Sequence, residues 1–245
     1  MIITKTPFRI SFVGGGSDLP AYFGKQRGAV LSTSIDKYMY ISTHAFFEKN
    51  KIRCKYSQTE TVDDVKNLQH PILRTVLEDF NLNGIEVSSI ADIPGGTGMG
   101  SSSSFTVGLL HNLSAFTGRS YGKQELGAGA CRVEIDLLKE PIGKQDQYAA
   151  AFGGLNVIEF NPDGSVDVHP CHVSDETRKT LNTNLKLYYL GNQRSASAIL
   201  AEQKENTSQE SKFQALTTMV GLVYKLRDAL EAGNLDDFGS LLHEN

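Results

Sequence analysis

The sequence predicts an α+β fold, in which strands and helices are mixed without strict strand–helix alternation. Three observations indicate it. Apolar and polar residues alternate near the N-terminus, β-branched and aromatic residues crowd residues 29–47, and a glycine- and serine-rich loop precedes apolar residues at helical spacing. The chain has 245 residues, of which 40% are hydrophobic and 21% charged, enough for one large domain or two modest ones.

In the first part of the chain, each expected element has a local signal. Phe8, Ile10 and Phe12 alternate with polar residues, which predicts a strand over residues 7–13 that ends at three successive glycines. A helix over residues 63–80 is expected to be interrupted, or restarted, at Pro71. Further strands are expected at residues 29–47, as one or two strands, and at 51–57 and 84–92.

In the second part, helices are expected at residues 101–116 and 123–138. A Pro-Asp-Gly turn predicts a hairpin over residues 155–169. A strand is expected at residues 185–191, and helix from residue 195 onward. The apolar face of this last helical region is Phe213, Leu216, Val220, Val223, Leu226 and Leu230.

The charge pattern excludes some classes of partner. The net charge is −4 and no block of Lys and Arg stands out, which argues against nucleic-acid binding and against docking on a membrane surface. The N-terminus lacks the pattern of a secretory signal, and no apolar run approaches the ~20 residues of a membrane helix. Three cysteines at spacings that match no zinc motif predict free thiols. A cytoplasmic protein is therefore expected.

The loop IPGGTGMGSSSSF, residues 93–105, carries the strongest functional signal. It lies between an expected strand and an expected helix, where glycines let the backbone wrap a phosphate and the helix N-terminus attracts anions. A flexible linker is the alternative, but linkers rarely lead into an apolar-periodic helix. The loop has no P-loop lysine and does not fit the dinucleotide fingerprint. The residues expected to bind the nucleotide are Gly96, Gly98, Met99, Gly100, Ser101, Ser102 and Ser103.

Three ordered motifs resemble those of the GHMP kinases. PGGTGMGSSSS is similar to their nucleotide loop, with Met99 in the place of a leucine. PFRISFVGGGSDLPAYF, residues 7–23, resembles their first, substrate-binding motif, and EPIGKQDQYAAAFGG, residues 140–154, resembles the segment that carries the catalytic aspartate. The resemblance implies a two-lobed α+β fold with a ribosomal-protein S5-like N-terminal lobe, and ATP and Mg²⁺ as co-substrate and cofactor.

The same resemblance implies catalytic roles for two residues. Asp146 matches the catalytic aspartate, which would accept the proton of the acceptor hydroxyl; the alternative is that it caps the helix that follows. Arg9 matches the arginine of the first motif, which would face the substrate and the aspartate; the alternative is a solvated strand arginine. For magnesium, the resemblance implies Ser102 and Glu134. Glu134 could equally face solvent, and Asp136 or Glu140 could compete with it.

The implied substrate is a small phosphorylated sugar. The residues of the three motifs resemble most closely those of the family members that phosphorylate the anomeric hydroxyl of D-glycero-D-manno-heptose 7-phosphate, a step in nucleotide-heptose and surface-glycan synthesis. L-Fucose kinases are the nearest alternative. Galactokinases carry Glu-His where this chain has two glycines. The residues expected to bind the substrate are Arg9, Gly15, Gly16, Ser17, Asp18, Lys144 and Arg194.

The resemblance stops short of the third family motif, a C-terminal glycine-rich segment that does not occur within residues 1–245. We therefore expect an N-terminal lobe over residues 1–152 and an incomplete C-terminal lobe over residues 153–245. An incomplete lobe would leave apolar surface uncovered, which favours homo-oligomers or low stability. It also keeps open a second kind of function, a catalytically silent module that binds nucleotide or sugar.

Overall fold

The computed structural model describes residues 1–188 and 210–245. These residues form two compact units that interleave along the chain. The first unit contains residues 1–8, 35–140 and 146–152, and the second contains residues 9–34, 141–145 and the described residues from 153 on. The first two strands each contribute residues to both compact units. The expected division into lobes over residues 1–152 and 153–245 stays a prediction.

The long strand β2 (Gly28–Ala45) organises the strand pairing. Its second half pairs antiparallel with β5 (Ile85–Ala91), its first half pairs antiparallel with β6 (Leu155–Phe160), and β1 (Ile2–Val13) pairs with it as well. Residues 29–47, for which the sequence left one or two strands open, thus hold one. β1 begins five residues before the expected strand because the alternation of buried and exposed side chains continues back to Ile2.

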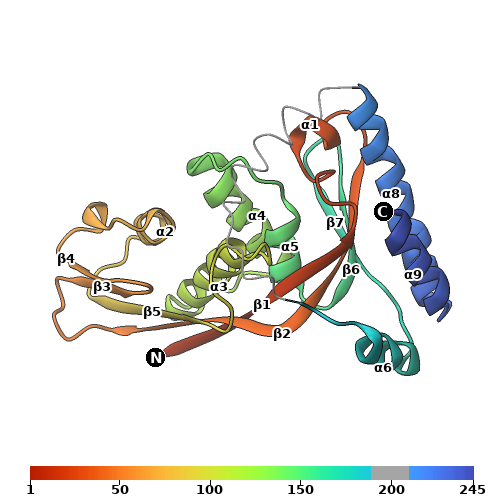
Figure 1. Ribbon diagram of the computed structural model, residues 1–245. Helices are drawn as coiled ribbons and strands as arrows, with labels where there is room; N and C mark the ends of the chain where they lie inside the picture. The colour runs from red at the N-terminus through yellow and green to blue at the C-terminus, as the bar shows by residue number, and fades with distance from the viewer. Residues whose placement is uncertain (189–209) are drawn as a thin grey trace. The chain divides into compact units, whose positions relative to one another are not determined.

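In the first unit, helices pack on one set of strands. Its remaining strands are β3 (Ile52–Lys55) and β4 (Thr59–Val62), and Figure 1 shows α2 lying over β3 and β5. β3 pairs parallel with β5 and antiparallel with β4. The helices are η1 (Val65–Asn67), α2 (Pro71–Phe80), α3 (Ser101–Phe116), α4 (Lys123–Cys131), the π-helical η2 (Arg132–Leu137) and α5 (Gln145–Phe152).

The helices of this unit largely follow the sequence signals. α3 has the expected bounds, and Pro71 starts α2 after a separate 3₁₀ turn, as its lack of an N–H favours at a first helical position. The helix expected over residues 123–138 changes into a π-helical turn at Arg132, which periodicity does not signal. Strand β4 was not expected. Its side chains alternate only between exposed and half-buried, so it has no apolar face.

The second unit contains a hairpin and a helical pair. Its elements are α1 (Pro20–Phe23), β6, β7 (Val166–Pro170), α6 (Asp175–Asn184), α8 (Glu210–Glu231) and α9 (Leu235–Glu244). The antiparallel pairing of β6 with β7 confirms the hairpin. The expected apolar face of α8 is buried against β1, β2 and β6 in one core cluster, with Phe213 at its margin stacked on Tyr22 at 4.7 Å between ring centroids.

The strand expected at residues 185–191 is wrong for its described part. Leu185 caps the C-terminus of α6 by donating its N–H to the carbonyl oxygen of Leu181, and Leu187 and Tyr188 are exposed. A short apolar run does not by itself distinguish a strand from other structure. Residues 189–191, and residues 195–209 of the expected helical region, lie outside the described residues.

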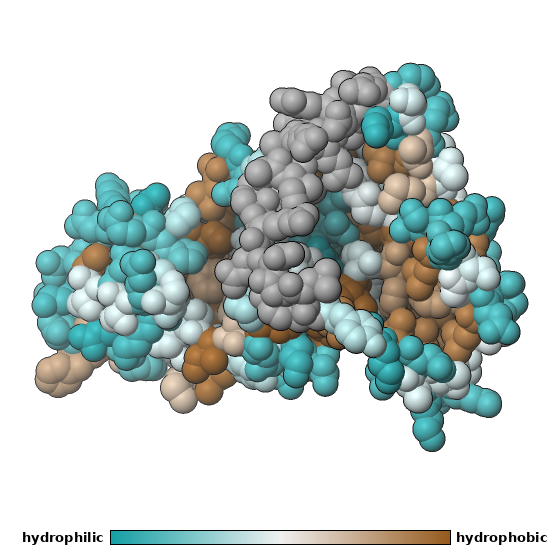
Figure 2. All heavy atoms as spheres, viewed as in Figure 1, coloured by the Kyte–Doolittle hydropathy of each residue, from teal (hydrophilic) through white to brown (hydrophobic). Residues whose placement is uncertain are grey.

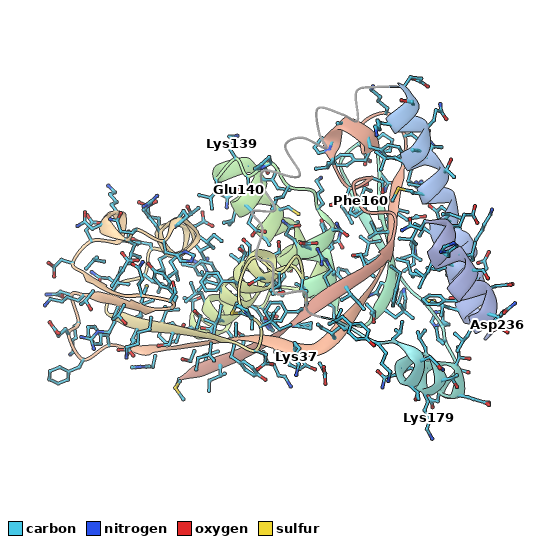
Figure 3. The ribbon with its side chains drawn as sticks, in the orientation of Figure 1. Lys37, Lys139, Glu140, Phe160, Lys179 and Asp236 are labelled. Carbon is cyan, nitrogen blue, oxygen red and sulfur yellow. The ribbon has the colours of Figure 1, made fainter. Side chains whose placement is uncertain are left out.

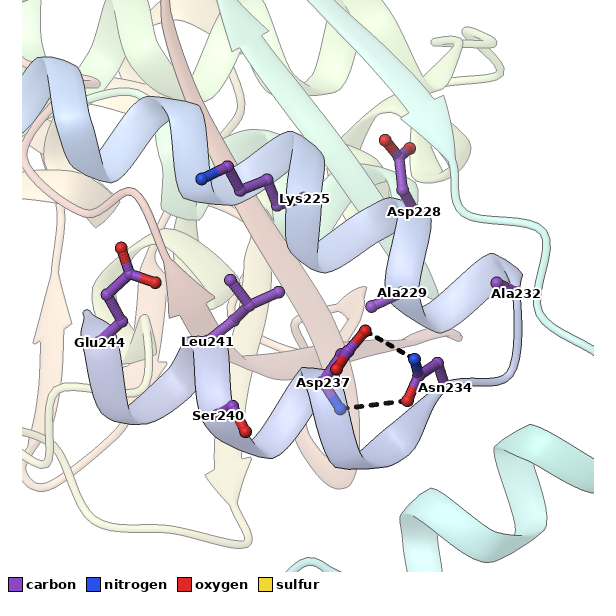
Figure 4. A pocket seen from close by; sticks show the side chains of 9 residues that line it. All are labelled: Lys225, Asp228, Ala229, Ala232, Asn234, Asp237, Ser240, Leu241 and Glu244. Carbon is purple, nitrogen blue, oxygen red and sulfur yellow. Dashed lines mark hydrogen bonds between the residues drawn. The ribbon is translucent and has the colours of Figure 1, made fainter.

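Apolar side chains reach the surface beside α8 and α9 in the view of Figure 2. A pocket of about 520 Å³ opens between these two helices, with Lys225, Asp228, Leu241 and Glu244 among its lining residues (Figure 4). None of the predicted site residues that the structure describes lines it. In the described part of the chain, no helix has both the length and the apolar character needed to cross a membrane.

Candidate active site

The glycine-rich loop connects β5 to α3, as the sequence predicts. Gly96, Gly98 and Gly100 have φ values of +77°, +76° and +74°, a left-handed backbone that favours glycine. Gly100 is the N-cap of α3, and no side chain caps the first N–H groups of this helix. An added Cβ at Gly98 would meet no atom within 4 Å, so the loop faces open space. A backbone of this kind at a helix N-terminus can bind a phosphate.

Two apolar side chains anchor this loop to the first unit. Ile93 and Met99 are partly buried and pack against its hydrophobic core. Met99 stands where GHMP kinases carry a leucine, and its contact with the core explains why an apolar residue is needed between two left-handed glycines. These two contacts hold the loop in place, while Gly95, Gly96 and Gly98 remain exposed.

Beneath the loop, side chains converge on the carboxylate of Glu134. Ser102 donates a hydrogen bond of 2.5 Å to Oε1, and Ser103 donates one of 2.8 Å to Oε2. Gln147 donates from Nε2 to the same Oε2 at 2.7 Å. The exposed fraction of Glu134 is 0%, so the alternative of a solvent-facing helix residue is wrong.

Burial and hydrogen bonding act on the charge of Glu134 in opposite directions. Removal from water raises the pKa of the Glu134 carboxyl above its ordinary value, and the hydrogen bonds from Ser102, Ser103 and Gln147 lower it. Burial is the larger effect, so the net pKa is raised. A carboxylate with three side-chain donors is the arrangement that a buried ionised group requires.

Sequence reasoning missed Gln147. Its side chain is fully buried, its Nε2 contacts Glu134, and its Oε1 has no hydrogen-bond partner among the described residues. Two features of the sequence could have indicated it. Gln147 directly follows Asp146 in the first turn of α5, and the three residues after it are buried, so a polar side chain stands on an apolar part of the helix. A buried amide in such a helix needs a polar partner, and Glu134 supplies it.

The donor set fits a magnesium ion that also binds phosphate oxygens. A hydroxyl and a carboxylate are hard oxygen ligands, and Mg²⁺ usually takes only one or two of these from the protein. Of the competing carboxylates, Asp136 and Glu140 are both exposed, and Figure 3 shows Glu140 next to Lys139, beyond the end of η2. No cluster of three or more His, Cys, Asp or Glu suited to a metal occurs among the described residues.

Asp146 is the second residue of α5. It therefore lies in the first turn, where a carboxylate also interacts favourably with the helix dipole, so the alternative that it caps this helix stays open. Its side chain is half-buried. It lies next in sequence to Gln147, so one helical turn carries both the predicted base and a donor to Glu134.

In the second unit, the triple glycine forms a tight turn after β1. Gly14 and Gly16 have φ values of +94° and +90°. The hydroxyl of Ser17 is fully buried, donates to the carbonyl oxygen of Gly14 at 2.8 Å and accepts the N–H of Ala29 at 3.1 Å. An added Cβ at Gly15 would meet nothing within 4 Å, so the turn is open at this residue. Ser17 thus supports the turn from inside.

The remaining predicted substrate residues differ in their surroundings. Arg9 lies on β1 and is half-buried. The ammonium group of Lys144 donates to the carbonyl oxygen of Gly164 at 2.6 Å and lies 5.0 Å from the ring centroid of Phe23. Asp18 is buried and accepts backbone N–H groups. Arg194 lies outside the described residues.

A glycine-rich loop at a helix N-terminus is typical of sites that bind phosphate groups. Residues 67–154 match the family described as GHMP kinases N terminal domain. This segment therefore carries a GHMP kinase N-terminal domain, as the motifs within it predict.

Three relatives define this similarity further. The chain is 29% identical to the D-glycero-alpha-D-manno-heptose 7-phosphate kinase of Campylobacter jejuni over 98% of its own length and 74% of that protein. It is 30% identical to the L-fucokinase/L-fucose-1-P guanylyltransferase of Bacteroides fragilis, over 69% of this chain and 18% of that protein. The crystal structure of a D-glycero-D-manno-heptose 1-phosphate kinase from Bacteroides thetaiotaomicron superposes with a TM-score of 0.83 at 24% identity, covering 98% of this chain and 76% of that one. The α+β fold expected from the sequence is confirmed.

Proposed function

We propose that this protein is an ATP-dependent sugar kinase that transfers the γ-phosphoryl group to the anomeric hydroxyl of D-glycero-D-manno-heptose 7-phosphate. The observation that carries the proposal is the convergence of Ser102, Ser103 and Gln147 on buried Glu134, directly below a loop suited to phosphate. The similarity to the Campylobacter heptose 7-phosphate kinase supports the choice of sugar.

In this proposal, the loop residues from Gly96 to Ser103 bind the phosphates of ATP through backbone N–H groups and hydroxyls. Ser102 and Glu134 hold Mg²⁺, which when bound neutralises charge on the phosphate oxygens. The role of Ser103 and Gln147 is to hold the Glu134 carboxylate in place from its other oxygen.

The chemical step in this proposal needs a base and a cation at the sugar. Asp146 accepts the proton of the anomeric hydroxyl as its oxygen bonds to the γ-phosphorus, and the bond to the β-phosphate oxygen breaks to release ADP. Arg9 stabilises the developing negative charge, and the turn at Gly15 and Gly16, with Lys144, admits the sugar. A cytoplasmic location, and association into homo-oligomers, belong to the same proposal.

L-Fucose is the second candidate substrate, because the Bacteroides fragilis fucokinase is also similar to this chain. The test is magnesium-dependent ADP release with heptose 7-phosphate, with L-fucose and unphosphorylated heptose run in parallel. Asp146→Asn keeps the shape of the side chain and removes its basicity, so it serves as the matched blank. We expect turnover with heptose 7-phosphate that is lost in this variant. Turnover with fucose alone would change the substrate, and ATP binding without turnover would indicate a silent module.

A further inference from the structure

Asp18 makes contacts that its predicted role does not require. Its side chain is 3% exposed, and both carboxylate oxygens accept backbone N–H groups: Oδ1 from Gly16 at 3.1 Å and Oδ2 from Gln145 at 3.2 Å. Its carbonyl oxygen accepts the N–H of Lys144 at 3.3 Å. All four residues belong to the second unit. Asp18 therefore ties the glycine turn to residues 144 and 145, which are 126 and 127 positions further along the chain.

Gly143 shows how closely this segment approaches Asp18. A Cβ added at Gly143 would lie 1.9 Å from Oδ2 of Asp18 and 2.3 Å from its Cγ. Gly143 is not among the glycines with positive φ, so its backbone conformation by itself would accept an alanine. The same Cβ would lie 2.9 Å from the backbone carbonyl oxygen of Asp18. The glycine is therefore required by the close approach of Asp18, mainly of its carboxylate, and not by the turn.

The segment held in this way leads directly into α5. Gln145 is the first residue of this helix, so its N–H has no partner within the helix and is satisfied by the Asp18 carboxylate. The side chain of Gln145 is held as well, since Ser11 donates to its Oε1 at 2.9 Å. The next residue is Asp146.

We propose that Asp18 is a positioning residue, which fixes residues 143–145 and through them the first turn of α5, a role beyond the sugar binding that the family resemblance implies. The proposal rests on the proposed kinase function only for its catalytic consequence. The contact itself is a property of the folded chain and can be measured without substrate.

Gly143→Ala tests the proposal without changing Asp18. We expect kcat to fall by roughly 10- to 100-fold, the order expected for a displaced catalytic group, with KM for the sugar changed by less than about threefold. In an Asp18→Ala background, the added methyl group no longer meets a carboxylate, and the carbonyl oxygen of residue 18, at 2.9 Å, is the remaining close atom. Gly143→Ala should then reduce kcat at least about threefold less than it does in the unchanged background, because the two substitutions disturb the same carboxylate contact. Gly221→Ala, on α8 with no atom within 4 Å of the added Cβ, is the matched control and should match the unchanged protein.

Hydrogen exchange of the ligand-free protein supplies the second measurement. In Asp18→Asn, which retains shape and loses charge, amides of residues 143–148 should exchange at least about tenfold faster, while those of α3 remain unchanged. Unchanged exchange in both Asp18→Asn and Gly143→Ala would overturn the proposal. A higher KM for the sugar in Asp18→Asn, with kcat and exchange unchanged, would also overturn it and leave sugar binding as the one role of Asp18. If the protein has no kinase activity on the tested sugars, the exchange result still decides the contact, so the two proposals fail separately.

Discussion

Replacing Ser103 by alanine tests whether Glu134 is an ionised group held by hydrogen bonds. Ser103 and Ser104 are neighbours on α3, with exposed fractions of 2% and 1%, and each donates one hydrogen bond. The acceptor differs: Ser103 donates to the Glu134 carboxylate at 2.8 Å, and Ser104 donates to the carbonyl oxygen of Pro7 at 2.9 Å. Ser104→Ala is therefore a control matched in helix, burial and atoms removed.

The expected magnitudes follow from the acceptor. A hydrogen bond to a charged group contributes about 1.5–3 kcal/mol to stability, and a neutral one about 0.5–1.5 kcal/mol. The gain in helix propensity on replacing serine by alanine is the same at both positions and cancels in the comparison. We expect Ser103→Ala to lower the free energy of unfolding by roughly 1 kcal/mol more than Ser104→Ala at neutral pH.

The assay is urea unfolding followed by far-ultraviolet circular dichroism, with chelator present so that no metal binds Glu134. At about pH 4, where the Glu134 carboxyl is protonated in both folded and unfolded chains, the difference between the two variants should shrink. Equal losses at neutral pH, within about 0.5 kcal/mol, would refute the reasoning, because Ser103 would then have a neutral acceptor or none.

Three further outcomes are expected. Because burial raises the pKa of Glu134, the folded protein binds this proton more tightly than the unfolded chain does. With chelator present, the unfolding free energy of the unchanged protein should therefore fall, relative to that of Glu134→Gln, as pH rises from about 4.5 through the raised pKa. Parallel pH profiles of the two proteins would contradict this. Gly14→Ala places a Cβ 2.1 Å from the carbonyl oxygen of Ala29 at a φ of +94° and should lower the melting temperature strongly or prevent folding. Gly15→Ala, with open space around the added atom, should shift the melting temperature little. Similar melting curves for the two variants would contradict the close approach of Gly14 to Ala29. Burial raises the pKa of the Cys54 and Cys171 thiols to about 12, so both should react with a thiol reagent at about pH 8 only after unfolding, and rapid labelling of the native protein would contradict their burial.

Local patterns determined most of the secondary structure. α3 has the bounds predicted from its apolar spacing, and the hairpin of β6 and β7 lies around the Pro-Asp-Gly turn. These elements are set by side-chain period and turn chemistry, which act between residues close in sequence. Where the local signal was weak, prediction failed. β4 has no apolar face, and the π-helical turn at Arg132 follows a helix with no break in its pattern.

The sequence by itself also indicated the GHMP kinase N-terminal domain and the phosphate-suited loop, because both depend on residues that are contiguous in the chain. It did not determine the surroundings of the acidic residues. Glu134 could face solvent or magnesium, and Asp18 matched a sugar-binding position. Only the tertiary structure brings Ser102, Ser103 and Gln147 to Glu134, and residues 143–145 to Asp18, across separations of 13 to 127 residues. Burial and hydrogen bonding of a charge depend on such distant neighbours, which is why they are decided by packing and not by local sequence.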